Sequence, residues 1–418
     1  MRVSRRGGSV CNIVTKMLAG GSLLLPGLWL LASFPGLLAE AGGERRKVTL
    51  QYNPGLASSS VNLLHVRAVG HNDTLHYVWS SIGAPAVLLL YTRSEHSALR
   101  VNWTKLFSSS PAGALWIEPP GSVLYSTGVV FTKVFEYNGA NASALPEGQF
   151  YPPYDLAGFS WQSLNRTLNR TALTATFRGV DTSDPGGAFR NGTISFKVTA
   201  YEQSSRDGPL PRLLHTANSS KVEFIMDQVA PRGNGSRFLL EVVTVEEKGG
   251  RKRLRSVRSI DDEFTPTIFE MAQLVSEPRN NSLGSSFFQW KTTAYGSRDA
   301  SRENAIRCHY HPLQTANRTL PGPSILHAYF GEGLGHSLTI AAINISFGGE
   351  DGEIYAEKGY LSWSALLGFG VPPEDTFSPL VIAIMAVALG TPVVLLVAGG
   401  MVVLFVRRTR YSEYQPIN

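Results

Sequence analysis

The stretch Ile194-Ser-Phe-Lys-Val-Thr-Ala-Tyr201 alternates apolar and polar side chains along most of its length. A period of two places the apolar side chains on one face of an extended chain, so this stretch predicts a strand half buried in a core. Clusters of Gly, Pro, Asn and Ser separate similar runs, and no stretch before residue 360 keeps a helical period over three turns. The sequence therefore predicts an all-β body. The similar runs are Leu63–Val69, Leu75–Trp79, Ala86–Tyr91, Leu99–Trp103, Val129–Tyr137, Leu173–Phe177, Val222–Met226, Phe238–Val245, Phe287–Tyr295 and Leu338–Phe347.

The size of the body favours two domains. The chain has 418 residues, and setting aside two apolar terminal segments and a short tail leaves residues 42–379. That length is too great for one typical sandwich and suits two. We expect two packed β-sandwich domains, 42–205 and 206–379, the second including a juxtamembrane segment. Charged residues make up only 17% of the chain, which argues against a coiled coil, a helical bundle or charge-rich disorder.

The first 41 residues have the pattern of a secretory signal peptide. Basic residues come first, an apolar run from Met17 to Leu38 follows, and Ala39-Glu40-Ala41 forms a small-x-small cleavage site. Because the apolar run is long, an uncleaved anchor is the alternative. Gly and Pro residues interrupt the run, and we expect cleavage after Ala39 or Ala41.

A second apolar segment predicts one transmembrane helix over residues 380–406. Its 27 residues carry no charge, and about 20 apolar residues are enough to cross a bilayer. Arg407, Arg408 and Arg410 follow at once, and basic flanks stay in the cytosol. The expected topology is single-pass type I, with a lumenal body and a cytosolic tail at 407–418.

Small side chains form a stripe along this predicted helix. Ala383, Ala386 and Gly390 lie three and four residues apart, so they share one helix face. Small residues let a second helix approach closely, which makes the stripe a candidate contact with a membrane partner. The ordinary Ala and Gly content of membrane helices explains the stripe equally well.

The net charge gives no reason to expect a nucleic-acid partner. The formal charge is +6, but the signal segment carries +3 and the tail +2 of it. The remaining +1 is spread over a near-neutral body without a dominant basic face. All nine histidines lie in this body, so an acidic compartment would raise its charge towards +10.

Eleven of the 18 asparagines begin an Asn-x-Ser/Thr sequon. Every sequon lies between the two apolar segments, where a lumenal body would meet the glycosylation machinery. We expect each sequon to mark a surface position, since a glycan cannot be buried. The predicted N-glycosylation sites are Asn72, Asn102, Asn141, Asn165, Asn169, Asn191, Asn218, Asn234, Asn280, Asn317 and Asn344.

The tail contains a candidate sorting signal, Tyr414-Gln415-Pro416-Ile417. A tyrosine followed at the third position by a bulky apolar residue fits the signal that clathrin adaptors bind as an extended peptide. Pro416 favours an extended Gln415, which lowers the cost of ordering the peptide. The place of the signal, close behind the span and one residue from the chain end, is typical of lysosomal membrane proteins.

The remaining motifs give little support for an enzyme, and no cofactor is predicted. His309 and His311 share a strand face, but two ligands without a third make a weak metal site. The glycine-rich stretch Gly331–His336 lacks the strand–loop–helix context of a phosphate loop. Neither a nucleophile elbow nor a zinc-protease helix motif occurs in the sequence.

Two further features each allow more than one interpretation. Cys308 is the one cysteine beyond the signal segment, and a buried apolar role is favoured over an intermolecular bridge or a reactive thiol. The basic run 248–258 resembles a nuclear import signal or a proprotein-convertase site, but we favour a solvated loop.

The stretch Tyr360–Pro373 lies just before the predicted span and is apolar with aromatic side chains. Tyr360, Trp363 and Phe369 make it a candidate contact with the membrane interface or with a neighbouring protein. A final packed strand or helix of the body is the alternative.

Several long and idiosyncratic stretches of the chain point to a known family. They are Asn62–Gly70, Thr74–Ser80, Tyr151–Tyr154, Pro211–Ala217, Ser259–Phe264, Tyr360–Trp363, Ile384–Gly390 and Tyr411–Asn418. Through these stretches the chain resembles the glycosylated lysosomal membrane protein family over nearly its whole length, and their length makes the resemblance specific.

The resemblance implies a non-enzymatic accessory subunit that binds a lysosomal dipeptide transporter of the major facilitator superfamily and protects it from lumenal proteases. Mammalian relatives carry several lumenal cysteines, whereas Ser220 and Ala341 occupy two of those places here, so the disulfides of the family are not expected. Two alternatives stay open at this point. One is a structural glycoprotein of the lysosomal membrane without a specific client, and the other is a lumenal binding protein or hydrolase.

Overall fold

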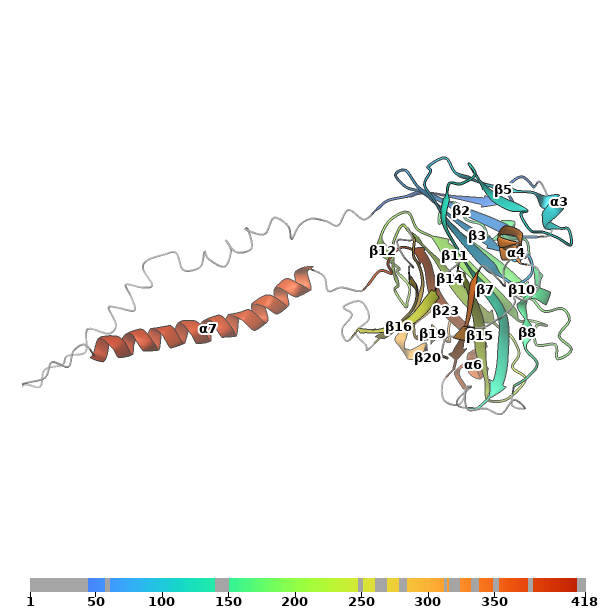
Figure 1. The fold of residues 1–418 in the computed structure, drawn as a ribbon. Coiled ribbons are helices and arrows are strands. Elements are labelled where there is room, and N and C mark those ends of the chain that lie inside the picture. The colour runs from blue at the N-terminus through green and yellow to red at the C-terminus, as the bar shows by residue number, and fades with distance from the viewer. Residues whose placement is uncertain are drawn as a thin grey trace, which may run out of the picture. The chain divides into compact units, whose positions relative to one another are not determined.

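The computed structural model divides the chain into two compact units (Figure 1). One is a β body within residues 43–376, and the other contains a long helix near the C-terminus. The structure describes residues 44–56, 61–139, 150–246, 251–259, 269–277, 284–311, 314–315, 324–331, 338–348, 353–374 and 379–411.

The first sheet of the body is antiparallel and begins at the N-terminal end of the described chain. Neighbouring strands follow the order β1, β2, β3, β4, β7, β15, β22, with short β8 beside β7 and short β21 beside β22. The bounds are β1 (Lys47–Tyr52), β2 (Leu63–Val69), β3 (Thr74–Ser80), β4 (Ala86–Thr92), β7 (Val123–Asn138), β8 (Tyr154–Asp155), β15 (Ser236–Glu246), β21 (Gln314–Thr315) and β22 (Thr339–Phe347).

The second sheet is also antiparallel, in the order β9, β10, β11, β14, β23, β18, β17, β16. Strand β20 pairs with β19 at one end and with β22 at the other, which joins the two sheets. The bounds are β9 (Ser160–Trp161), β10 (Thr174–Val180), β11 (Thr193–Ala200), β14 (Ser219–Asp227), β16 (Arg251–Ser259), β17 (Phe269–Glu277), β18 (Ser286–Lys291), β19 (Thr293–Tyr295), β20 (Ala305–Tyr310) and β23 (Tyr360–Phe369).

The inner faces of the two sheets form one apolar core. Phe131 of β7 lies 4.8 Å from Phe196 of β11, measured between ring centroids, and Phe347 of β22 lies 5.9 Å from Trp363 of β23. In β11 the apolar residues Ile194, Phe196 and Val198 are all buried while Lys197 and Thr199 remain partly exposed. The alternation therefore predicted both the strand and its buried face, and the all-β fold class is confirmed.

The first sheet is also covered on its outer face. Successive residues of a strand point to opposite faces, and in β4 Leu89 enters the central core while Leu88 and Leu90 enter a second apolar cluster. That cluster includes residues of the β5–β6 hairpin and of two short helices (Figure 1). These covering elements are β5 (Ala98–Val101), α3 (Trp103–Leu106), β6 (Leu115–Glu118) and α4 (Ile325–Phe330).

Short elements complete the body. A small cluster on the outer face of the second sheet contains Leu213, which lies beside the β12–β13 pair. The remaining elements are η3 (Leu156–Gly158), η4 (Leu164–Arg166), β12 (Ser205–Arg206), β13 (Leu214–His215), η5 (Arg302–Asn304) and α6 (Glu353–Lys358).

The arrangement of strands differs from the expected division at residues 205 and 206. Strand β11 before that point pairs along its length with β14 after it, and β7 pairs in the same way with β15. Both sheets and the central core therefore contain residues from each side, and residues 43–376 form a single compact unit. Turn-rich composition at 206–212 marks the β12–β13 connection rather than a linker between domains.

The second unit contains α7 (Pro379–Tyr411). Its apolar part, Ile382–Thr409, is long enough to cross a membrane. The expected span 380–406 lies within this helix, and no other described helix has the length and composition of a span. Thr391 donates its hydroxyl to the carbonyl of Val387 at 2.6 Å, one residue before Pro392.

Candidate functional site

Six of the predicted glycosylation sites lie exposed on the described body: Asn72, Asn102, Asn165, Asn169, Asn191 and Asn234. All six lie outside the named strands, in the bends, turns and short helical segments between them, where a glycan has room. Asn102 begins α3 and accepts the amide of Lys105 with its side chain. Whether each sequon carries a glycan stays a prediction. The sequons at Asn141, Asn280 and Asn317 lie outside the described residues.

Two further sequons are only partly exposed. Asn218 donates its Nδ2 to Glu44 at 2.9 Å and accepts from Arg46 at 2.5 Å. Asn344 lies within β22 opposite Glu241, and its Oδ1 is buried without a hydrogen-bond partner among the described residues. We expect these two sites to be less accessible than the exposed six because both residues are only partly exposed.

The stretch before the helix is a strand of the core. β23 lies between β14 and β18 in the second sheet, and Trp363 is only 1% exposed against Phe288 and Phe347. Tyr360, Trp363 and Phe369 were predicted to contact the membrane or a partner. For Trp363 this prediction is corrected, because its side chain lies in the core of the body. The apolar character of the stretch serves internal packing, since residues 361–368 of β23 are all buried.

The basic run also differs from expectation. Residues 251–258 belong to β16, an edge strand paired with β17, rather than to a solvated loop. Lys252 is buried there, while Arg255 and Arg258 are exposed. Charged side chains along an edge discourage pairing with a strand of another chain.

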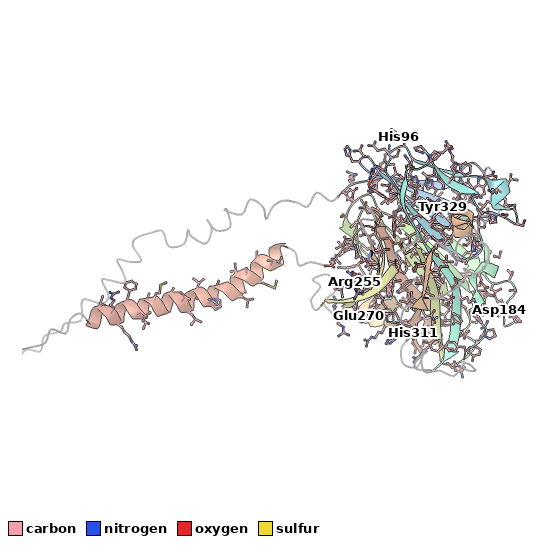
Figure 2. All side chains as sticks on the ribbon, in the orientation of Figure 1. His96, Asp184, Arg255, Glu270, His311 and Tyr329 are labelled. Atoms are coloured by element: carbon pink, nitrogen blue, oxygen red, sulfur yellow. The ribbon has the colours of Figure 1, made fainter. Side chains whose placement is uncertain are left out.

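No catalytic or metal-binding group is assembled from the sequence candidates in the described part. His309 is exposed at the end of β20, and Cys308 beside it is buried. No group of three or more His, Cys, Asp or Glu side chains in the described ranges is placed to hold a metal ion. Figure 2 shows His96, Asp184 and His311 at separate parts of the body. Gly331 ends α4 with a positive φ of 78°, and the rest of the glycine-rich stretch is outside the described residues.

A stacked pair of buried histidines was not foreseen from the sequence. His65 Nε2 lies 2.9 Å from His76 Nδ1, the rings are nearly parallel, and both side chains are at most 1% exposed. Gln51 Oε1 contacts His65 Nδ1 at 3.2 Å, and Ser97 Oγ contacts His76 Nε2 at 2.8 Å. Burial lowers the pKa of His65 to about 3 and the pKa of His76 well below its ordinary value. Neutral rings fill this site.

A buried ion pair links strands β15 and β16. Lys252 Nζ lies 2.7 Å from Glu246 Oε1, and both side chains are at most 2% exposed. Tyr125 and Thr127 each donate a hydroxyl to the Glu246 carboxylate at 2.6 Å. Burial raises the pKa of Glu246, but the charge of Lys252 and these hydrogen bonds outweigh burial and hold the pKa below its usual value. The carboxylate therefore stays ionised inside the body.

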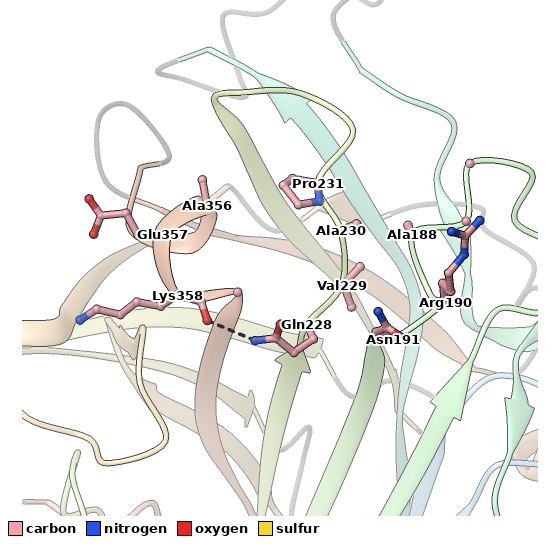
Figure 3. Close-up of a pocket in the computed structure, with 13 residues that line it drawn as sticks. Ala188, Arg190, Asn191, Gln228, Val229, Ala230, Pro231, Ala356, Glu357 and Lys358 are labelled. Atoms are coloured by element: carbon pink, nitrogen blue, oxygen red, sulfur yellow. Dashed lines mark hydrogen bonds between the residues drawn. The ribbon is translucent and has the colours of Figure 1, made fainter.

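One open pocket of about 540 Å³ lies where three connections meet (Figure 3). Its lining comes from residues 186–191 before β11, 228–231 after β14 and 356–359 at the end of α6. The backbone holds these connections together, because Ala230 donates to Ala188 at 2.9 Å and Gln228 donates to Gly359 at 2.6 Å. The predicted glycosylation site Asn191 lies on the wall.

Two further predicted sites concern the membrane helix and the tail. Ala383, Ala386 and Gly390 lie along α7 as expected. The sorting signal Tyr414–Ile417 lies outside the described residues. Both features stay predictions.

A two-sheet β body on the same chain as one apolar helix, with sequons spread over the body, defines a class of membrane-anchored glycoproteins. The family model "Glycosylated lysosomal membrane protein" matches residues 62–410. The chain belongs to this family and is a lysosomal membrane protein, with one apolar helix near the C-terminus in the part of the chain that the structure describes.

Named relatives match along almost the whole chain. Glycosylated lysosomal membrane protein A of Xenopus laevis is 54% identical over 400 residues, covering 95% of this chain and 98% of the relative. The Bos taurus protein is 45% identical over 393 residues, which cover 93% of this chain and 94% of the relative. The Homo sapiens protein is 43% identical over 395 residues, which cover 94% of this chain and 95% of the relative. These relatives are named as membrane glycoproteins and not as enzymes.

Proposed function

We propose that this protein is a non-enzymatic accessory subunit that stabilises a lysosomal transporter of the major facilitator superfamily, one that carries dipeptides, and protects it from lumenal proteases. The observation that supports the proposal is the spread of exposed sequons over one compact body, on a chain whose described residues include one helix apolar enough to cross a membrane. The proposed topology is type I, with the body in the lumen and the tail in the cytosol. The transporter as partner rests on the family resemblance.

The architecture suits a protective role. Proteases cleave backbone that can open locally. Three apolar clusters pack against the faces of the two sheets, so little of the backbone of this body can open. Glycans on the exposed sequons would hide the turns that remain. A helix in the same membrane as the client would keep the body at a high local concentration over the client's lumenal loops.

A pulse–chase of the transporter tests the proposal. In cells that lack this protein, the lifetime of the transporter should shorten while its synthesis is unchanged, and inhibitors of lysosomal proteases should restore its level. A chain ending at residue 374 should rescue poorly because it lacks the tether. An unchanged lifetime would reject the protective role and favour a structural glycoprotein without a client.

Purification in mild detergent tests the partner directly. The full chain should bring down one multispanning protein in a fixed ratio. Gly390→Ile should weaken this association, because it adds a bulky side chain to the small-residue stripe. Gly399→Ile is the matched control, since nine residues turn a helix by about two and a half turns and place it on the opposite side. Equal recovery with both variants would remove the stripe from the proposed contact.

A further inference from the structure

We propose that the pocket beside Asn191 binds the first sugars of the glycan attached to that same residue. The inference goes beyond the accessory role and does not depend on a transporter. It requires only that the body be glycosylated in the lumen. The site combines a modification position with a preformed pocket of the right chemistry.

The sequon is held against the pocket by its central glycine. A Cβ added to Gly192 would lie 2.5 Å from the carbonyl oxygen of Gln228 and 2.5 Å from the Cα of Val229. No larger residue fits such a close approach without a shift of the backbone, so Asn191-Gly192-Thr193 lies directly on the 228–229 connection. This contact fixes Asn191 at the wall.

The pocket is preformed by bonds that do not involve its contents. Tyr355 donates its buried hydroxyl to the carbonyl of Val229 at 2.8 Å, and Gly359 donates to the carbonyl of Tyr355 at 2.7 Å. Gln228 Nε2 contacts the carbonyl of Lys358 at 3.4 Å (Figure 3). The turn after α6 is thereby attached to the connection after β14.

The lining suits a carbohydrate. Sugars present hydroxyls that need both donors and acceptors, and C–H faces that favour apolar contact. Arg190 and Lys358 carry donors, Glu357 carries an acceptor, and exposed Pro231 supplies apolar surface. Figure 3 shows Arg190 and Asn191 on one side of the 228–231 segment and Glu357 and Lys358 on the other. The volume of about 540 Å³ lies within the range of small-ligand pockets.

The occupant is the protein's own glycan because attachment places it there. Glycosylation forms a bond from Asn191 Nδ2 to the anomeric carbon of the first sugar. It breaks the bond from that carbon to the diphosphate of a lipid-linked donor, and the Nδ2 loses one proton. A sugar tethered at the wall is present at an effective concentration of about millimolar, so weak contacts suffice to hold it.

Release of glycans from the native full-length protein tests the inference. A peptide N-glycosidase should free the Asn191 glycan about tenfold more slowly than the Asn234 glycan, as expected if nine-tenths of it is bound. Asn234 is the matched control, since Asn234-Gly-Ser is also an exposed Asn-Gly sequon but does not line the pocket. After denaturation the two rates should be equal. Unmodified Asn191, or equal rates in the native protein, would overturn the inference.

Filling the pocket provides the second arm. Ala356→Trp adds a large side chain at the pocket, and it should raise the release rate at Asn191 in the native protein to the rate at Asn234. The control Ala305→Trp lies at an exposed position on β20 and should change neither release rate. Asn191→Gln should speed hydrogen exchange over residues 353–359, and Asn234→Gln should not. Failure of Ala356→Trp to raise the rate, or unchanged exchange in Asn191→Gln, would also overturn the inference.

Discussion

At the scale of single residues, burial decides how this protein responds to acid. Six of its histidines have a pKa below the ordinary value: His65, His76, His215, His309, His311 and His327. In each case the largest cause is desolvation, which disfavours the charged ring. The expectation that an acidic compartment charges all nine histidines is therefore corrected. The folded body gains less charge than its composition suggests.

The histidine pair predicts a loss of stability in acid. Unfolded histidines bind protons below about pH 6.5, while buried His65, with a pKa of about 3, stays neutral. The free energy of unfolding should therefore fall by about 1.4 kcal/mol per pH unit for each such ring as the pH drops from 6.5 towards 4.5. Denaturant unfolding of the full chain at several pH values measures this slope.

Glutamine does not titrate, so His76→Gln should remove the contribution of one ring, about 1.4 kcal/mol per pH unit, from the slope of unfolding free energy against pH. Ser97→Ala is the matched control, because it removes a hydrogen bond to the same ring but leaves the ring in place. The control should lower stability equally at each pH. A slope in His76→Gln equal to that of the unchanged protein would contradict this account.

At the scale of elements, β23 shows how an apolar stretch before a membrane helix can belong to the core. Trp363→Ala should lower the free energy of unfolding by about 3–5 kcal/mol, because a large ring between Phe288, Trp290 and Phe347 is removed. Trp116→Ala, at a side chain 39% exposed, should cost less than about 1 kcal/mol. Thermal unfolding of the two variants gives the comparison. Equal melting temperatures would place Trp363 outside the core.

The tail predicts the route of the protein. Tyr414→Ala should empty one pocket of a clathrin adaptor and increase the amount of protein at the cell surface, measured by surface biotinylation. Tyr411→Ala is the matched control and should have a smaller effect, since Tyr411 lies outside the four-residue signal. Unchanged lysosomal residence of the Tyr414 variant would place the sorting information elsewhere.

At the scale of the whole molecule, the two halves of the body depend on each other. A fragment ending at residue 205 should not fold, because β11 would lose its neighbour β14 and β7 would lose β15. Residues 42–374 should unfold in one cooperative transition. Limited proteolysis of the secreted fragments 42–205 and 42–374 measures whether each fragment is folded. A protease-resistant 42–205 fragment would restore the two-domain interpretation.

Strands could be predicted from the sequence where burial follows a period of two, as in β11. The apolar run Ala86–Tyr91 also predicted a strand, but its pattern could not show which side chains enter which core, because β4 is buried on both faces and its residues alternate between two cores. Lys252 looked like part of a solvated run, and only its ion pair with Glu246 shows why a charge is buried there. Sequence patterns report one face of one strand, whereas these features depend on residues distant along the chain.

The candidate site shows the same limit. The sequons were found by a local motif, and six of them are exposed as a glycan requires. The pocket at Asn191 could not be found in this way, because its walls come from three connections that are more than 30 residues apart along the chain.

The lone buried Cys308 has a consequence for the chemical surroundings of the protein. The chain has two cysteines, and Cys11 lies in the predicted signal peptide, so the mature body would have no internal disulfide. Burial raises the pKa of the Cys308 thiol, which keeps it in the unreactive protonated form. Thiol reductants should therefore leave the unfolding midpoint unchanged. Noncovalent contacts must therefore hold this body together under reducing conditions, in which a body cross-linked by disulfides would lose part of its stability.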